Sequence, residues 1–212
     1  MKITRYEHAC MVLEKGEERL VIDPGSFTRS LADLDRVAAV VITHEHADHW
    51  TPEHLAAIRA ANPGVRMLGP DGVKLAVADQ PIEPVRAGDV VEVGSWRLEF
   101  FGEKHAVIHA SIPVIDNVGV LVDDAFYYGG DSYTAPGRPV ELLAAPTGAP
   151  WLKIGDVIDY VLEVAPRRSI AVHDRPLSED VGIPMQHARI KWATEQGGGT
   201  FVPLAPGDAL TL

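Results

Sequence analysis

A continuous apolar run followed at once by a histidine-rich stretch is the feature that most restricts how this chain folds. The run Val37-Ala38-Ala39-Val40-Val41-Ile42 has the length of a strand and suits one that is buried on both faces. Thr51-Pro52-Glu53 then supplies an N-cap hydroxyl, a proline at the first helical position and an acid, which predicts a helix to about Ala60. The stretch from His44 to His49 is therefore a short connection between a buried strand and a helix.

This connection, Thr43-His44-Glu45-His46-Ala47-Asp48-His49-Trp50, is unusually rich in metal-binding side chains, with three histidines and two acids within six residues. Imidazole suits zinc, iron, nickel and copper, and carboxylates add affinity for harder ions such as manganese. Alternate side chains of an extended stretch face the same way, so His44 and His46 can hold one ion. Asp48 and His49 lie further along the bend and can face a second ion. The alternative interpretation is a polar surface loop.

Short apolar segments separated by turn residues occupy the rest of the chain. The predicted strands cover 3–6, 10–13, 19–22, 65–68, 90–93, 96–101, 118–122, 125–128, 140–144, 169–172 and 200–202, and further helices cover 72–78, 156–164 and 183–195. Two strand-rich halves, each with its own helices, favour two sheets packed face to face with helices outside. Since no short-period repeat or long linker interrupts the chain, we predict one domain over residues 1–212.

Composition excludes several classes of protein. With 46% hydrophobic and 23% charged residues the chain can bury a sizeable core, and its net charge of -11 argues against non-specific nucleic-acid binding. Cys10 is the only cysteine, which excludes an internal disulfide and a thiolate metal cluster. The start MKITRYEHAC lacks a basic region followed by an apolar stretch, and no apolar run has membrane-spanning length. We therefore expect a cytoplasmic protein with a small-molecule substrate and no membrane partner; the sequence does not indicate an oligomeric state.

The pattern His44-x-His46-x-Asp48-His49 after a buried strand resembles the hallmark of the metallo-β-lactamase superfamily. The resemblance covers the whole chain and implies an α+β fold, a four-layer αββα sandwich of two mixed sheets with outer helices and metals at one edge. It also implies a role for Asp23, at the end of the third predicted strand, in steadying the metal loop. Without the resemblance, Asp23-Pro24 reads equally well as a turn.

The resemblance implies the remaining metal ligands. A histidine after a strand is expected, and His105 and His109 compete for this place; we favour His105, which comes first after the strand ending at Phe101. Asp131 in Gly129-Gly130-Asp131 matches the bridging aspartate, and His173 matches the last histidine. The implied site has His44, His46 and His105 on one ion, Asp48, His49 and His173 on the other, and Asp131 bridging.

Such a site generates a hydroxide from water between two divalent ions, with zinc the leading candidate and manganese or iron the alternatives. Asp48 is the candidate catalytic residue, which orients the hydroxide or passes a proton to the leaving group. Several branches of the superfamily need a leader, a long insert, a flavin domain or a helical extension, so the resemblance narrows to compact lactonase-like hydrolases of small esters, lactones or phosphodiesters. The alternative is a non-catalytic metal-binding or scaffold protein of the same fold.

Four further residues lie outside the implied ligand set and have predicted roles. Trp151 and Lys153 are candidates to contact the substrate, because they follow a predicted strand on the side where pockets of this family open; the equal alternative is a loop that covers the core. His109, if it is not a ligand, is a substrate candidate in the pocket or a structural hydrogen-bonding residue. His8 lies in a segment similar to the first strand of lactonase-like members, and we favour its interpretation as a turn or core histidine.

Overall fold

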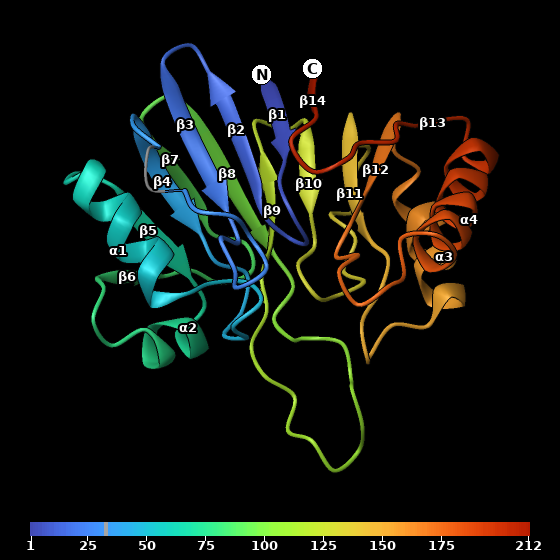
Figure 1. Cartoon of the computed structure of the whole chain (residues 1–212), viewed down its shortest axis with the longest axis horizontal. Coiled ribbons are helices and arrows are strands. Elements are labelled where there is room, and N and C mark those ends of the chain that lie inside the picture. Colours follow the sequence, from blue (N-terminus) through green and yellow to red (C-terminus); the bar gives the residue numbers. More distant parts are fainter. Residues whose placement is uncertain (32–33) are drawn as a thin grey trace.

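The computed structural model describes residues 1–31 and 34–212, and within them the chain forms two seven-stranded sheets packed face to face (Figure 1). The first sheet has the order β14-β1-β2-β3-β4-β5-β6, and its strands span Ala209–Thr211, Lys2–Arg5, Met11–Lys15, Glu18–Ile22, Val37–Val41, Arg66–Gly69 and Ile82–Pro84. The second has the order β13-β12-β11-β10-β9-β8-β7, with strands Thr200–Phe201, Arg168–Val172, Leu142–Pro146, Phe126–Tyr128, Gly119–Val122, Trp96–Phe101 and Val90–Val93. Each sheet mixes parallel and antiparallel neighbours.

Helices cover the outer face of each sheet. Helices α1 (Pro52–Ala61) and α2 (Asp71–Ala76) lie beside the first sheet, and α3 (Ile154–Val164) and α4 (Gly182–Gln196) lie beside the second (Figure 1). Three apolar clusters match these layers: one lies between the sheets, and the other two lie between each sheet and its helices. The αββα sandwich expected from the sequence is confirmed.

Strand β4 shows why the sequence folds in this way. Ala39 and Val41 point into the cluster between the sheets, whereas Val37, Val40 and Ile42 pack under the helices. The strand is therefore buried on both faces, as its continuous apolar run predicts. Helix α1 begins as predicted, because the Thr51 hydroxyl accepts the N–H of His54 and Pro52 occupies the first turn.

Two strands of the first sheet, β6 and β14, were not predicted from the sequence. Both have three residues and lie at the two edges of that sheet. None of the helices in the described ranges is long and apolar enough to cross a membrane.

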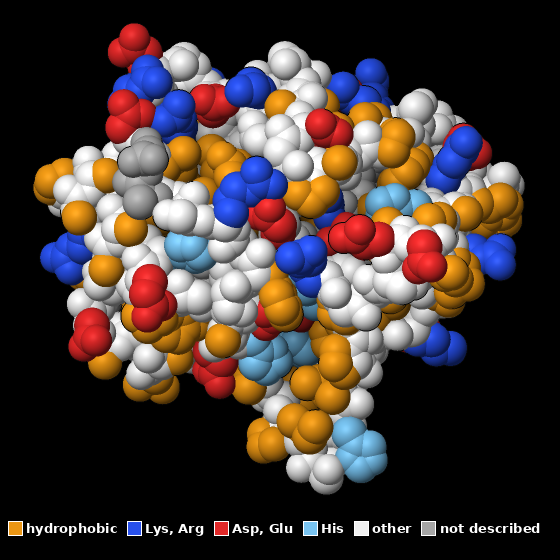
Figure 2. Space-filling view, in the orientation of Figure 1, with side chains coloured by type: hydrophobic (Ala, Val, Ile, Leu, Met, Phe, Trp, Pro, Cys, Tyr) orange, Lys and Arg blue, Asp and Glu red, His pale blue; other side chains and the backbone are white. Residues whose placement is uncertain are grey.

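A long segment between β8 and β9 projects from one end of the sandwich (Figure 1). Its base is closed by the Lys104–Asp116 bridge and by the His105 N–H, which donates to Ile115 O. Figure 2 shows hydrophobic side chains on this projection, which carries the exposed residues Val107, Ile112 and Val114. The histidines described next lie where the projection leaves the body of the molecule.

Candidate metal centre

Two clusters of metal-ligating side chains lie together at one edge of the sandwich. One contains His44, His46, His105 and Asp131, and the other contains His8, Asp48, His49 and His173; within each, the potential ligand atoms all lie within 4.8 Å of one another. Histidine side chains reach the surface beside the projecting segment (Figure 2). All the side chains that the sequence predicted as ligands are thus brought together, in the two predicted groups.

Parallel strands explain this convergence. Strands β3 and β4 are parallel in the first sheet, and β10, β11 and β12 are parallel in the second, so within each sheet their carboxyl ends lie at one edge. The clusters form where these two edges face each other. Asp23 follows β3, the histidine-rich connection follows β4, Asp131 follows β10 and His173 follows β12.

Asp131 lies between the two clusters. Its Oδ2 is 3.4 Å from His105 Nε2 and 3.2 Å from His173 Nε2, and its Oδ1 is 3.3 Å from His49 Nε2. Gly130 has φ +65° and an added Cβ would lie 2.5 Å from Asn117 Oδ1, so a side chain there would push this loop out of place. The carboxylate can therefore reach both clusters.

Asp23 holds the histidine-rich connection from behind. Its carboxylate is fully buried and accepts the Thr43 N–H at 2.8 Å, the Thr43 hydroxyl at 2.7 Å and His49 Nδ1 at 2.6 Å. Because Asp23 accepts the proton on Nδ1, His49 turns Nε2 toward the cluster, where this nitrogen can take a metal ion.

Three other histidines are fixed in the same tautomer. The Thr43 hydroxyl donates its hydrogen to Asp23, so the hydroxyl oxygen is left to accept the Nδ1–H of His44 at 3.0 Å. His105 Nδ1 donates to Ala106 O at 2.5 Å, and His173 Nδ1 donates to Gly148 O at 2.7 Å. Like His49, all three therefore turn Nε2 into the clusters, where this nitrogen can take a metal ion or, without metal, a proton.

Two buried polar atoms in this arrangement lack the partner that a metal cation would supply. Within the described ranges, the buried atoms His105 Nε2 and Asp131 Oδ1 have no hydrogen-bond partner. His49 Nε2 and His173 Nε2 face each other at 3.3 Å, and because Nδ1 of each ring donates to an oxygen, these two nitrogens are the ones free to take a metal ion or a proton. Ring nitrogens whose second N–H is tied to an oxygen, grouped around carboxylates, are the usual setting of a metal ion.

The electrostatics of the side chains without metal lead to the same conclusion. Burial opposes a charge on His173, but the Asp131 carboxylate outweighs it and raises the pKa of His173 to about 9. Burial also opposes ionisation of Asp48, yet hydrogen bonds from His173 and His8 hold its pKa well below the ordinary range. The carboxylates thus attract a positive charge, which a proton supplies when no metal does.

His105 and His109 have different surroundings. His105 is buried in the first cluster, whereas His109 is exposed on the projecting segment, where its Nδ1 bonds to the Ser111 hydroxyl. The geometry is that expected if His105 is the ligand, and this ligand role stays a prediction. His109 belongs to neither cluster.

The two other substrate candidates also differ. Trp151 is buried, and its Nε1–H donates to Asp131 Oδ2 at 2.9 Å. The Lys153 side chain is 78% exposed and lies 3.5 Å from Asp156. Contact of either residue with a substrate stays a prediction.

His8 lies buried in a turn, as the sequence analysis favoured, but the sequence did not indicate its place in the second cluster. It is buried with left-handed backbone (φ 60°), and its Nε2 lies 3.0 Å from Asp48 Oδ2. Burial lowers the pKa of His8 to about 4. The only hint in the sequence was the similarity of this segment to the first strand of lactonase-like proteins. The contact with Arg175 could not be foreseen, since the two residues lie more than 160 positions apart in the chain.

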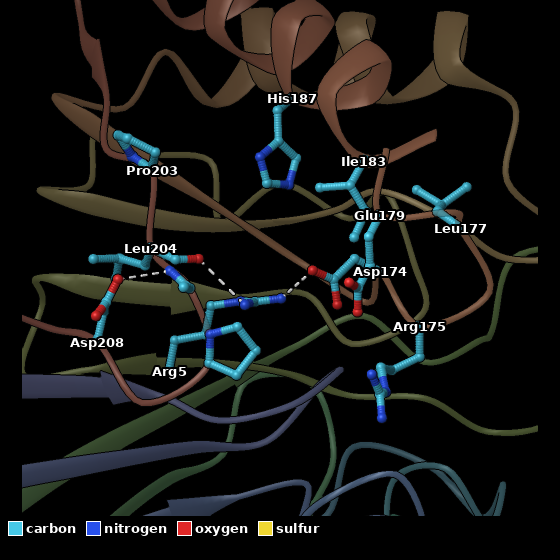
Figure 3. A pocket seen from close by; sticks show the side chains of 12 residues that line it. Arg5, Asp174, Arg175, Leu177, Glu179, Ile183, His187, Pro203, Leu204 and Asp208 are labelled. Atoms are coloured by element: carbon cyan, nitrogen blue, oxygen red, sulfur yellow. Dashed lines mark hydrogen bonds and ion pairs between the residues drawn. The ribbon is translucent and has the colours of Figure 1, made fainter. Parts of the chain in front are cut away.

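Figure 3 shows a cavity of about 640 Å³ at the segment that follows His173 of the second cluster. Asp174 and Arg175, which directly follow His173, line it, and the buried Arg5 guanidinium forms an ion pair with Asp174 across its floor. This pair ties the end of β1 to the end of β12. The two sheets are thereby held together next to the clusters.

Comparison with known proteins agrees with this geometry. The family model of the Beta-lactamase superfamily domain matches residues 2–173. Protein Rv0786c of Mycobacterium tuberculosis is 34% identical over 185 residues, which cover 85% of this chain and 87% of that protein.

Solved structures share the fold at low sequence identity. A candidate metal-dependent hydrolase from Parabacteroides distasonis has a TM-score of 0.77 at 16% identity, with 95% of this chain and 91% of that chain covered. The metallo hydrolase Igni18 from Ignicoccus hospitalis has a TM-score of 0.71 at 16% identity, with 99% and 97% covered. By its family match and its αββα sandwich, the chain belongs to the β-lactamase superfamily and has the fold of that superfamily's metal-dependent hydrolases.

Proposed function

We propose that this protein is a hydrolase that holds two divalent metal ions and cleaves a small ester, lactone or phosphodiester. The observation that carries the proposal is the position of Asp131 between two clusters of inward-facing histidines. The first ion would be held by His44, His46 and His105, the second by Asp48, His49 and His173, and Asp131 would bridge them. Two such ions lower the pKa of a shared water molecule and polarise an oxygen of the substrate.

The exposure of the clusters favours catalysis over a purely structural metal site. His44, His49 and His173 are buried, but His46 is half-buried and the Asp48 side chain is 28% exposed. Structural sites are closed by protein ligands, whereas catalytic sites keep a side open to substrate. Asp48 lies on that open side, where its carboxylate can hold a proton close to the leaving group.

The chemistry of the surroundings agrees with a nucleophile derived from water. Cys10 directly precedes β2 and is fully buried between the first sheet and its helices, and burial raises the pKa of its thiol far above the ordinary value. It is therefore unsuited to nucleophilic attack. The zinc form is our leading proposal, because imidazole is the main ligand in both clusters, and manganese and iron remain the alternatives to test.

Metal content tests the site directly, and the chain offers a matched pair of histidines. Protein purified without added chelator and then loaded with Zn²⁺ or Mn²⁺ is expected to hold two equivalents of metal per chain by elemental analysis. His105→Ala should lose at least one equivalent, and His109→Ala, an exposed histidine four residues away, should retain both. Loss of metal in His109→Ala with full retention in His105→Ala would contradict the ligand set.

Activity tests the second half of the proposal. A panel of generic phosphodiesters, lactones, carboxylic esters and thioesters should be assayed with the zinc-loaded and manganese-loaded protein. We expect hydrolysis of at least one class, abolished by His46→Ala without loss of fold. A protein that binds two metal ions and hydrolyses none of the panel would favour the alternative, a metal-binding scaffold.

A further inference from the structure

His8 differs from the other buried histidines in the hydrogen bond that fixes its ring. The Arg175 N–H donates to His8 Nδ1 at 3.4 Å, so this nitrogen carries a lone pair and the proton is on Nε2. His44, His49, His105 and His173 are fixed in the opposite way, with the proton on Nδ1. The ring nitrogen that His8 turns toward the second cluster is thus an N–H donor.

The acceptor of that proton is Asp48. His8 Nε2 lies 3.0 Å from Asp48 Oδ2, within hydrogen-bond distance, and the His8 side chain is 1% exposed. The ring of His8 also packs against that of His173, with the ring centroids 3.8 Å apart and the ring planes tilted by 45°. A donor buried in this position holds one carboxylate oxygen of Asp48 in place.

The backbone of His8 is clamped by the same segment that fixes its ring. His8 O accepts the His173 N–H at 2.8 Å, and His8 Nδ1 accepts the Arg175 N–H. The left-handed φ of 60° at a residue other than glycine is a strained conformation that persists only where its surroundings hold it. Arg5 and Asp174, seen in Figure 3, hold the neighbouring parts of the two segments together.

From this geometry we infer that His8 is a positioning residue of the proposed metal site: its Nε2–H orients Asp48, and it is not itself a ligand. The role of Asp48 as a metal ligand rests on the proposed function. The orientation of Asp48 by His8 rests on the hydrogen bonds alone. A ligand role would require the proton on Nδ1, which would place two N–H groups against each other at the Arg175 contact. Outer hydrogen bonds of this kind set the orientation and affinity of metal-binding side chains.

Two substitutions separate the donor from the strained backbone. His8→Gln places an amide N–H near the position of Nε2, but glutamine suits φ 60° poorly. His8→Asn suits the left-handed backbone and can accept from Arg175 N–H, but it is too short to reach Asp48. We expect His8→Asn to bind the second equivalent of Zn²⁺ about 10–100-fold more weakly by calorimetry. His8→Gln should stay within a few-fold of wild type and unfold at a lower temperature when metal-free.

Three results would overturn the inference. Equal weakening by both variants would make His8 a ligand, and wild-type affinity in His8→Asn would make it a packing residue. The third is independent of metal: long-range ¹H–¹⁵N correlation spectra of the chelated protein should show His8 with its proton on Nε2, and a proton on Nδ1 would contradict the proposed geometry. Wild-type protein that binds no metal would instead overturn the proposed function, while this tautomer measurement would still decide the role of the His8 ring.

Discussion

The indole Nε1–H of Trp151 donates a 2.9 Å hydrogen bond to Oδ2 of Asp131, the carboxylate that lies between the two histidine clusters. The indole ring also lies near His105 and His173, with centroids 5.6 Å and 6.1 Å away. Trp151 thus contacts both halves of the proposed site through one side chain.

Trp151→Phe should keep the packing of the ring but remove this donor. We expect a fall of about 10-fold in metal affinity or in kcat, with little change in the temperature of unfolding. Trp192→Phe is the matched control, because Trp192 is half exposed on α4. An effect of equal size in both variants would exclude a specific role for the Trp151 hydrogen bond.

Asp131→Ala removes the carboxylate proposed to bridge the ions. The variant should hold at most one equivalent of metal, and elemental analysis after gel filtration measures this. Asp156→Ala, on the exposed first turn of α3, serves as control and should retain two. Retention of two tightly held ions in Asp131→Ala would refute the bridging role.

Asp23→Asn tests the charge behind the histidine-rich connection. Asparagine tolerates the φ of 47° at this position, but it has a single acceptor oxygen. It therefore cannot accept both the Thr43 N–H, which Oδ1 of Asp23 accepts, and the Thr43 hydroxyl and His49 Nδ1–H, which Oδ2 accepts. Metal affinity, measured by competition with a chromophoric chelator, should fall about 10–100-fold. Thr43→Val, which removes one of these donors, should give a smaller loss, and the reverse order would contradict the proposed support.

Gly25→Ala tests how closely the chain packs against the connection. A Cβ on Gly25 would lie 1.7 Å from Asp48 O and 2.6 Å from His49 N, so the backbone of one segment must move. We expect a loss of about 1–3 kcal/mol in the free energy of unfolding, together with weaker metal binding. Gly64→Ala has open space around its Cβ and is the control. Denaturant titration of the two variants should separate them clearly.

The thiol of Cys10 gives a prediction about pH. Its pKa is raised above the ordinary 9.0 because the side chain is buried. The unfolded chain therefore releases this proton at lower pH than the folded chain, so the thiol's contribution to stability is intact below the ordinary value and is lost as pH rises above it. Native protein should resist iodoacetamide at mildly alkaline pH and react once unfolded; rapid labelling of folded protein would show that the strand opens.

The sequence predicted the elements whose signals are local. The hairpin of β7 and β8 lies over 90–93 and 96–101 as expected, because a Gly-Ser turn separates two short apolar strands. Strand β14 was missed, since Ala209–Thr211 is exposed or half-buried and becomes a strand only by pairing with β1 at the opposite end of the chain. Such pairings depend on the tertiary fold and leave no periodic trace.

The same distinction applies to the candidate site. The histidine-rich connection is visible because its residues are neighbours in the sequence, whereas Asp131 and His173 were expected only because the resemblance to the superfamily implies them. His8 could not be placed, since its contacts with Asp48 and with residues 173–175 depend on how the two sheets dock. The hydrogen bonds that fix each histidine ring are likewise set by carbonyl groups that only the folded chain brings into range.

The proposed ligands come from both sheets: the first supplies residues 44–49, and the second supplies His105, Asp131 and His173. Metal binding and the docking of one sheet on the other are therefore thermodynamically linked, because an ion held by both sheets stabilises the docked state by a free energy that grows with the logarithm of its concentration. By the same linkage, a substitution in the apolar layer between the sheets, far from any ligand, lowers the apparent affinity for metal once it populates the undocked state. In such variants, metal affinity measures how well the two halves of the sandwich are packed.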